Sequence, residues 1–156
     1  MAFTPTRTDF TRSPFTGMTR ESWLEAGKYL LTGIFANLGS ADDPLVMPRA
    51  ETEITYPHLS ADGAQQARER KAEVFEGLTR SFFIASVLIH EEPSLTLCGI
   101  PLRDYYKKHI LRVCTPGDDC YVGSYGDMQA LLRAEGTDDP IRPFQQTVET
   151  CALVIG

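Results

Sequence analysis

A carboxylate and a guanidinium stand one helical turn apart, at Glu76 and Arg80, just before a long apolar run. In a helix over residues 72–90, these two side chains share a face with Phe83 and Val87. Burying an unpaired charge costs several kcal/mol, so the two groups should pair, meet a ligand or border water. Two interpretations stay open: an i, i+4 ion pair at the helix surface, or part of a polar site.

A second polar pair follows the same design near the C-terminus, at Gln145 and Glu149. These residues also stand one turn apart, within residues 143–155, and their helical face continues into Ala152 and Gly156. Small residues leave room either for the close approach of another helix or for a cavity. The sequence does not separate these two alternatives.

A tyrosine and a histidine, Tyr56 and His58, lie close together in a proline-rich connection spanning residues 40–60. A connection of this length is usually functional or disordered. A histidine in a loop is most often exposed to solvent, and contact with a ligand is the alternative.

Composition limits the classes of function. The chain has 156 residues, 42% of them hydrophobic, which suits a single domain with one core. Its formal net charge of −6 argues against a nucleic-acid partner, because phosphate binding requires clustered basic residues. The short basic cluster Lys107, Lys108 and Arg112 is interpreted as a solvated helix face. The apolar run at residues 82–89 is far shorter than the roughly 20 residues that cross a bilayer, so no membrane partner is expected.

The N-terminus lacks the apolar region of a secretory signal, and we infer a cytoplasmic protein. Its cysteines, Cys98, Cys114, Cys120 and Cys151, have no C-x-x-C spacing, which argues against zinc and suits reduced thiols. A disulfide between Cys114 and Cys120 is the less favoured alternative.

No cofactor is expected. The turn-rich loop of residues 114–127 contains three glycines, but not in a phosphate-binding arrangement. Its aspartates, Asp118, Asp119 and Asp127, lack the spacing of an EF-hand, so they are only a weak signal for a cation. We therefore predict neither a metal nor an organic cofactor.

Helical periodicity dominates the chain, and no alternating strand pattern of convincing length occurs. The predicted helices span about 20–38, 62–90 and 102–113, followed by a short helical stretch at 128–132 and a last helix that begins at 140–143. The first helix starts at an N-cap, Thr19, and closes at Gly39. Its apolar spacing comprises Trp23, Ala26, Gly27, Leu30, Ile34 and Leu38. The predicted class is all-α, with helical hairpins packed side by side.

Several separated motifs resemble one family. The segments TGMTRESWLEAGKYLLTGIF, MPRAETEITYPH, FEGLTRSFFIAS and FQQTVETCALVIG are similar to the bacterial domain of unknown function 2264, and the match spans nearly the whole chain. The resemblance implies an (α/α) toroid, in which inner helices surround a cavity. It also implies a link with glycoside hydrolase family 154, which is associated with β-glucuronidase activity.

The resemblance carries over to particular residues. The family's E-G-x-x-R motif falls on Glu76, Gly77 and Arg80, and its Q-x-x-V-E motif falls on Gln145, Val148 and Glu149. The loop sequence Tyr56-Pro57-His58 also matches. The resemblance therefore implies a sugar site with Glu76 and Glu149 as catalytic residues, and with Tyr56, His58, Arg80 and Gln145 as substrate-binding residues.

Glycoside hydrolysis usually needs two carboxyl groups, roughly 5 Å apart in retaining enzymes and about 6.5 to 9.5 Å apart in inverting ones. On the implied assignment, one of Glu76 and Glu149 has a pKa raised by burial and donates a proton. The other activates water or attacks the sugar. Arg80 suits a substrate carboxylate, as in an oligosaccharide containing a uronic acid. The alternative is that Glu76 only locks Arg80 in place.

Family members are more than twice as long as this chain. We therefore expect residues 1–18 to be an N-terminal arm and residues 19–156 to be a partial toroid domain, truncated at its C-terminus. A partial toroid leaves apolar helix faces uncovered, which predicts a homo-oligomer or a complementary chain. The leading hypothesis is a glycoside hydrolase-like fragment, glucuronidase-like in its substrate class, with doubtful activity of its own. The alternative is a non-catalytic helical module that oligomerises or binds a partner through its uncovered apolar face.

Overall fold

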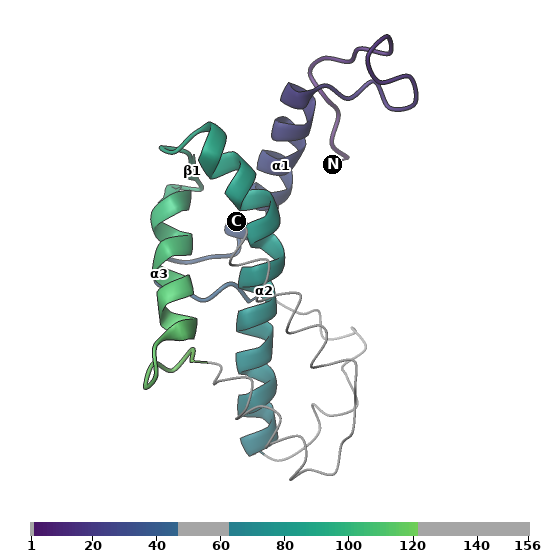
Figure 1. Cartoon of the computed structure of the whole chain (residues 1–156). Coiled ribbons are helices and arrows are strands. Elements are labelled where there is room, and N and C mark those ends of the chain that lie inside the picture. The colour runs from purple at the N-terminus through teal and green to yellow at the C-terminus, as the bar shows by residue number, and fades with distance from the viewer. Residues whose placement is uncertain (1, 47–62, 122–156) are drawn as a thin grey trace. The chain divides into compact units, whose positions relative to one another are not determined.

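The computed structural model describes residues 2–46 and 63–121, with side chains of the second range from residue 73 onward. This part of the chain is mostly helical (Figure 1), as the sequence predicts. Its elements are the helices α1 (Arg20–Phe35), α2 (Gly63–Glu91) and α3 (Leu102–Cys114), with the two-residue strands β1 (Thr96–Leu97) and β2 (Ile100–Pro101) between α2 and α3. Among the helices described, none has the length and apolar character needed to cross a membrane.

The chain divides into two compact units. Unit 1 contains residues 2–43 and 84–105, and the described residues of unit 2 are 44–46, 63–83 and 106–121. Both α2 and α3 therefore contribute one part to each unit. The predicted arm of residues 1–18 and helix α1 both belong to unit 1, and the predicted boundary at residue 19 stays a prediction.

Helix α1 begins where the sequence predicts. The Thr19 hydroxyl accepts a hydrogen bond from the backbone N–H of Ser22 at 3.3 Å, which satisfies one of the free donors of the first turn. Glu21 follows in that turn, where a negative charge is favourable. Hydrogen bonds from its own backbone N–H and from the Thr19 hydroxyl lower the pKa of the Glu21 carboxyl.

The end of α1 differs from the prediction. The helix ends at Phe35, before the predicted closing residue Gly39, which is not in the left-handed region. The Asp43 carboxylate accepts hydrogen bonds from the backbone N–H groups of Gly39 and Ser40, at 2.8 and 2.9 Å. The chain therefore leaves the helical path because a downstream aspartate binds these donors.

The core of unit 1 lies against one stripe of α1, which comprises Gly27, Leu31 and Phe35. A Cβ atom on Gly27 would lie 3.1 Å from Cγ2 of Ile84, so the first helix approaches the C-terminal part of α2 closely at this point. The Phe35 ring meets the Tyr105 ring edge-on, with centroids 4.9 Å apart.

The predicted apolar face of α1 was therefore wrong in part. Trp23 and Leu30, which the spacing grouped with Gly27, are 61% and 53% exposed. The buried stripe instead runs through Leu31 and Phe35. Helix α1 carries apolar side chains on two sides, and periodicity alone did not show which side packs inside unit 1.

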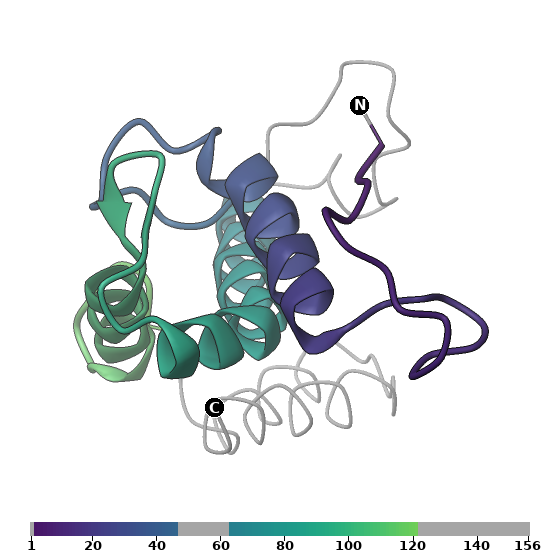
Figure 2. The ribbon, with the colours of Figure 1, turned by 90° about the horizontal axis from the view of Figure 1, so that it is seen from above.

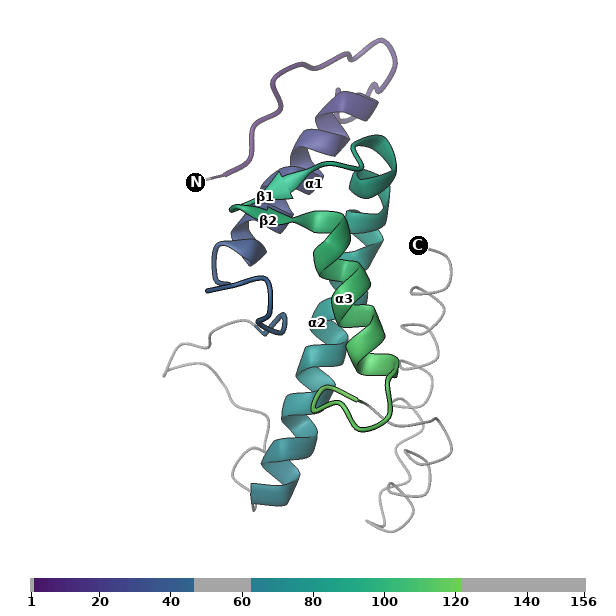
Figure 3. The same cartoon turned by 90° about the vertical axis from the view of Figure 1, so that its left-hand side faces the viewer.

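The hairpin of β1 and β2 was not predicted, because two-residue strands leave no alternating pattern. Leu97 pairs with Ile100, and the two residues between them, Cys98 and Gly99, have φ angles of 49° and 82°. Two consecutive positive φ angles are typical of a type I′ turn. Strand β1 contacts α1 in unit 1 (Figure 3).

In the described part of unit 2, the core is formed by parts of α2 and α3, and the bounds of these helices agree with the predicted ones to within one residue. Phe75, Leu78 and Phe82 are buried on one side of α2, as the periodicity predicts. Tyr106 and Val113 are buried on α3. The rings of Phe82 and Tyr106 lie 5.1 Å apart, so aromatic contact joins the two helices.

Candidate functional site

The structure brings together two of the predicted site residues, Glu76 and Arg80. Their side chains extend from consecutive turns of α2 in unit 2, with Oε2 of Glu76 and Nη2 of Arg80 3.1 Å apart. The Glu76 side chain is 43% exposed and that of Arg80 is 58% exposed. Of the two interpretations of this pair, the structure contains the i, i+4 ion pair at the helix surface.

This exposure limits what the ion pair contributes to stability. An exposed i, i+4 pair stabilises a helix by about 0.3 to 0.5 kcal/mol, because water screens both charges. With 43% of its side chain exposed, Glu76 lies at the surface of α2. The pair remains open to solvent, and a ligand can reach both charged groups.

An aromatic ring lies on the same side of α2. Phe83 follows Arg80 by three residues, so their side chains are neighbours on the helix surface. Its side chain is largely exposed, in contrast to the buried Phe82 beside it. A carboxylate, a guanidinium and a ring therefore line one accessible strip of α2, which we call the α2 polar strip: Glu76, Arg80 and Phe83.

The other predicted site residues lie outside the described part of the chain. They are Tyr56, His58, Gln145 and Glu149. The predicted separation of the carboxyl groups of Glu76 and Glu149 therefore stays a prediction, as does the cavity that they would share.

A buried polar network lies behind the α2 polar strip, and the sequence did not reveal it. The Tyr106 hydroxyl donates to Oγ of Ser81 at 2.7 Å, and the Ser81 hydroxyl donates to the carbonyl of Gly77 at 2.6 Å. Burial raises the pKa of Tyr106 above its usual value, and the hydrogen bond to Ser81 only partly offsets this effect. His109, one turn further along α3, is also buried.

The signal for this network was weak. Ser81 and Tyr106 stand 25 residues apart in the chain, and no spacing rule joins them. Lys107 and Lys108 are exposed, as expected. His109 follows them in the chain but stands three and four residues after Tyr106 and Tyr105, on the buried side of α3. A histidine on the apolar side of an otherwise basic helix was the only available hint.

The loop after α3 is held by an aspartate. Oδ2 of Asp118 lies 3.3 Å from Nε of Arg112, and its Oδ1 accepts a hydrogen bond from the backbone N–H of Cys120 at 2.8 Å. These contacts, first the bond from Cys120, lower the pKa of Asp118. Cys114 and Cys120 are both free thiols, so the alternative of a disulfide between them is wrong.

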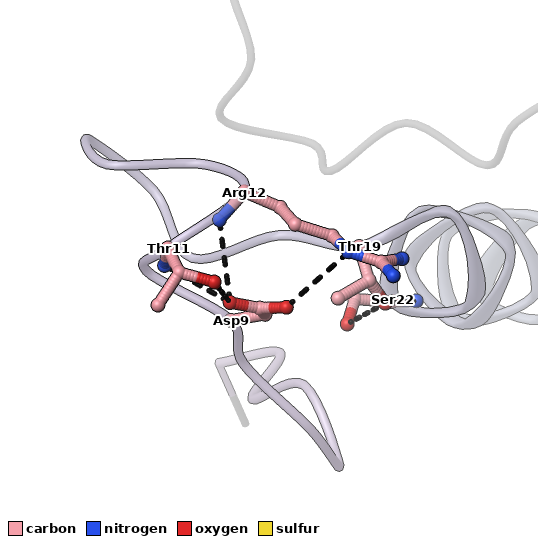
Figure 4. A network of polar contacts seen from close by, with 5 residues as sticks. All are labelled: Asp9, Thr11, Arg12, Thr19 and Ser22. Atoms are coloured by element: carbon pink, nitrogen blue, oxygen red, sulfur yellow. Dashed lines mark hydrogen bonds and ion pairs between the residues drawn. The ribbon is translucent and has the colours of Figure 1, made fainter.

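A second candidate surface lies in unit 1. The first described residues lie beside α1, where the Phe3 ring contacts the Tyr29 ring and the Ser22 hydroxyl donates to the carbonyl of Arg7. The segment from Asp9 to Gly17 forms a loop beyond the start of α1 (Figure 2). The backbone N–H of Asp9 donates to the carbonyl of Gly17 at 2.7 Å, which closes the loop. The Asp9 carboxylate accepts hydrogen bonds from the hydroxyl and the backbone of Thr11 (Figure 4), and these bonds lower the pKa of Asp9.

This closed loop and the outer side of α1 present many apolar side chains to solvent. Phe15 is 96% exposed. In the part of the chain that the structure describes, five of the eight exposed large apolar side chains belong to this region. We call them the N-terminal apolar surface: Phe10, Phe15, Trp23, Tyr29 and Leu30.

Comparisons with protein-family models, with curated proteins and with solved structures found no match to this chain. The resemblance to domain of unknown function 2264 therefore rests on the motifs quoted above and stays a prediction. The geometry of the α2 polar strip and of the N-terminal apolar surface carries the functional argument.

Proposed function

We propose that this chain is a helical module that packs against further helices through its N-terminal apolar surface. The observation that carries this proposal is the exposure of Trp23 and Leu30 on α1, directly beside the stripe of Leu31 and Phe35 that is buried within unit 1. Large apolar side chains that stay exposed beside a buried stripe mark a surface for a further partner. The buried stripe of α1 packs within unit 1, and we propose that the neighbouring exposed side chains pack against a further helical layer.

The driving force is the removal of apolar surface from water. Burial of such surface stabilises an assembly by roughly 25 cal/mol per Å². Large exposed aromatic side chains such as Phe15 and Trp23 are the residues that most often anchor protein interfaces. The hydrogen-bonded loop at Asp9 supports the same role, because a preorganised loop loses less conformational entropy when it binds.

The further layer that we propose consists of additional helices, as in an (α/α) toroid of which this chain forms the N-terminal part. The mostly helical fold and the family resemblance support this arrangement. In a homo-oligomer, a second copy of the chain would bury the same apolar side chains. A homo-oligomer consists of copies of this chain alone, whereas the toroid also contains further helices.

Sedimentation velocity over a range of concentrations tests the association. The account predicts self-association of the isolated chain through its N-terminal apolar surface, and a shift to monomer in the double variant Trp23→Ser/Leu30→Ser. Leu111→Ser is the matched control, because Leu111 is an equally exposed leucine on α3 and lies outside the N-terminal apolar surface. A wild-type chain that stays monomeric at high concentration, without binding an apolar dye, would contradict the proposal.

A second candidate function follows from the α2 polar strip. We propose that the complete assembly is carbohydrate-active and glycoside hydrolase-like, with an oligosaccharide that contains a uronic acid as its substrate. The accessibility of Glu76 and Arg80 beside an exposed ring favours this candidate, because sugars bind through charged hydrogen-bond partners and aromatic faces. The family resemblance supports the same class of substrate.

In this candidate, Glu76 and Glu149 are the two catalytic carboxyl groups. Arg80 binds the substrate carboxylate. Tyr56, His58 and Gln145 complete the sugar site. Glu76 acquires its catalytic surroundings only when further helices cover the α2 polar strip, so the isolated chain is expected to bind a sugar weakly and to turn it over slowly or not at all.

Sugar binding and turnover test the second candidate. Ligand-observed NMR with glucuronic acid, and with glucose as the neutral analogue, would show a preference for the acid that Arg80→Gln abolishes. A chromogenic glucuronide would report turnover, which Glu76→Gln and Glu149→Gln should remove while the fold stays intact. Glu73→Gln, on the same helix one turn earlier, is the control. Equal binding of the two sugars would contradict the role of Arg80.

We place this function in the cytoplasm. The three cysteines within the described residues, Cys98, Cys114 and Cys120, are free thiols, which supports a reducing compartment.

A further inference from the structure

One turn of α2 has two faces with different tasks. Glu76 and Arg80 form the exposed ion pair on its outer side. Gly77 and Ser81, each the next residue in the chain, face the rest of unit 2 through their backbone and hydroxyl contacts. The four residues lie on two consecutive turns of α2, and each residue of the ion pair is bonded directly to one of the contact residues, so a contact that fixes Gly77 and Ser81 also restrains Glu76 and Arg80.

Gly77 is the point at which another segment of the chain crosses α2. A Cβ atom on Gly77 would lie 2.2 Å from the carbonyl oxygen of Leu45 and 3.3 Å from its carbonyl carbon. Both of these are backbone atoms, so they cannot move aside as the end of a side chain could. Glycine is unfavourable in a helix interior, and here the backbone crossing requires it.

The carbonyl of Gly77 makes a second contact. It accepts the hydroxyl of Ser81 at 2.6 Å, and the hydroxyl of Tyr106 donates to Ser81 at 2.7 Å. Tyr106 is itself fixed by burial and by the Phe82 ring. Two independent contacts, one at the Cα of Gly77 and one at its carbonyl, therefore set the position of this turn within unit 2.

We propose that Gly77, Ser81 and Tyr106 are positioning residues for the ion pair of Glu76 and Arg80. The contact with Leu45 and the hydrogen bonds from Tyr106 through Ser81 fix the position of Gly77 in α2. The fixed backbone then holds the side chains of Glu76 and Arg80 close together on the outer side of the helix. The use of that place by a sugar rests on the carbohydrate-active candidate above. The positioning itself does not depend on it.

The Nε–Hε signal of Arg80 in ¹⁵N NMR spectra measures the position of the pair directly, and the loss of that signal in Arg80→Lys assigns it. Gly77→Ala should shift the Arg80 signal and lower the melting temperature, because the new methyl group displaces the Leu45 carbonyl. Gly33→Ala is the matched control: it adds the same methyl group to an α1 glycine with nothing within 4 Å, so it should leave the signal in place and raise the melting temperature slightly.

Tyr106→Phe provides a second test that keeps the ring and removes only the hydroxyl. We expect a smaller shift of the Arg80 signal than in Gly77→Ala, in a chain that still folds. An Arg80 signal unchanged in Tyr106→Phe and in any folded Gly77→Ala protein would overturn the positioning role. Failure of sugar binding in the wild-type chain would overturn the carbohydrate-active candidate alone, since the NMR signal of Arg80 does not require a sugar.

Discussion

The N-terminal apolar surface of unit 1 and the contact of α2 with α3 in unit 2 use their residues in opposite ways. In unit 2, the apolar side chains Phe75, Leu78 and Phe82 are buried, and the polar pair Glu76 and Arg80 is exposed. In unit 1, large apolar side chains remain exposed on α1 and on the loop before it. The contact of α2 with α3 buries its apolar side chains, whereas the N-terminal apolar surface leaves its own side chains exposed.

The α2–α3 contact also has a polar component. The α2–α3 contact buries a chain of hydroxyl groups from Tyr106 through Ser81 to the Gly77 carbonyl, and each hydrogen bond is made. Among the described residues, every buried side-chain nitrogen and oxygen has a hydrogen-bond partner. Satisfied polar groups of this kind specify one arrangement of two helices. An exposed apolar surface specifies much less until its partner is present.

The largest expected difference between the regions is the cost of truncating a leucine. Leu78→Ala, in the core of unit 2, should lower the free energy of unfolding by about 2 to 5 kcal/mol, because it leaves a cavity. Leu30→Ala, on the exposed side of α1, should change it by about 0.5 kcal/mol or less in dilute monomer. Urea unfolding measures both. Similar losses for the two variants would break the comparison.

The next effect concerns the buried hydroxyl of Tyr106. Tyr106→Phe removes the hydrogen bond to Ser81 and should cost about 1 kcal/mol of stability at neutral pH. Because burial raises the pKa of Tyr106, the folded state holds its proton at a pH where the unfolded chain releases it near the usual 10.0. Wild-type stability is therefore retained below pH 10 and falls as the pH rises above that value.

Denaturant titrations at a series of pH values check this dependence. In Tyr106→Phe, the free energy of unfolding should fall less above pH 10 than in the wild type, because residue 106 no longer titrates. A variant with the same alkaline loss as the wild type would show that this tyrosine is not buried as the structure places it.

A smaller effect is expected for the exposed ion pair. A double-mutant cycle with Glu76→Ala and Arg80→Ala should give a coupling energy of about 0.3 to 0.5 kcal/mol, which decreases at high salt. Circular dichroism melts of the four proteins provide the values. A coupling of several kcal/mol, insensitive to salt, would mean that further helices cover the α2 polar strip in the protein as purified.

The smallest effect concerns the loop before α1. Asp9→Ala removes the acceptor for Thr11, so amide exchange at residues 11 and 12 should increase with little change in global stability. Because its hydrogen bonds lower the pKa of Asp9 below the usual 3.8, protection in the wild type should persist at neutral pH and be lost as the pH falls through the lowered pKa. Protection that survives in the variant would assign the loop's order to other contacts.

Much of the helical structure could be predicted from the sequence. The spans of α2 and α3 follow from long apolar periodicity, and Thr19 was recognisable as an N-cap. The end of α1 was not predictable, because it depends on the Asp43 carboxylate binding the backbone of Gly39. Spacing rules consider apolar periodicity and capping residues, and they do not include a hydrogen bond from the backbone to a side chain several residues downstream.

The candidate site was predictable only in part. The spacing of Glu76 and Arg80 identified the pair, but not that it is accessible to solvent. The E-G-x-x-R motif included Gly77, but the sequence did not show why glycine is needed there. The cause is the close approach of the Leu45 carbonyl, which lies 32 residues earlier in the chain. Exposure and crossing points are properties of packing between distant segments, and local patterns do not encode them.

Fluorescence of Trp23 tests the central claim most directly, because it is the only tryptophan of the chain and belongs to the N-terminal apolar surface. Emission and acrylamide quenching would be recorded across a wide range of protein concentrations. The account predicts red-shifted, readily quenched emission in dilute solution, and blue-shifted, protected emission as the chain associates. Association of the chain with Trp23 still fully quenchable would contradict the claim that this surface is the one that binds.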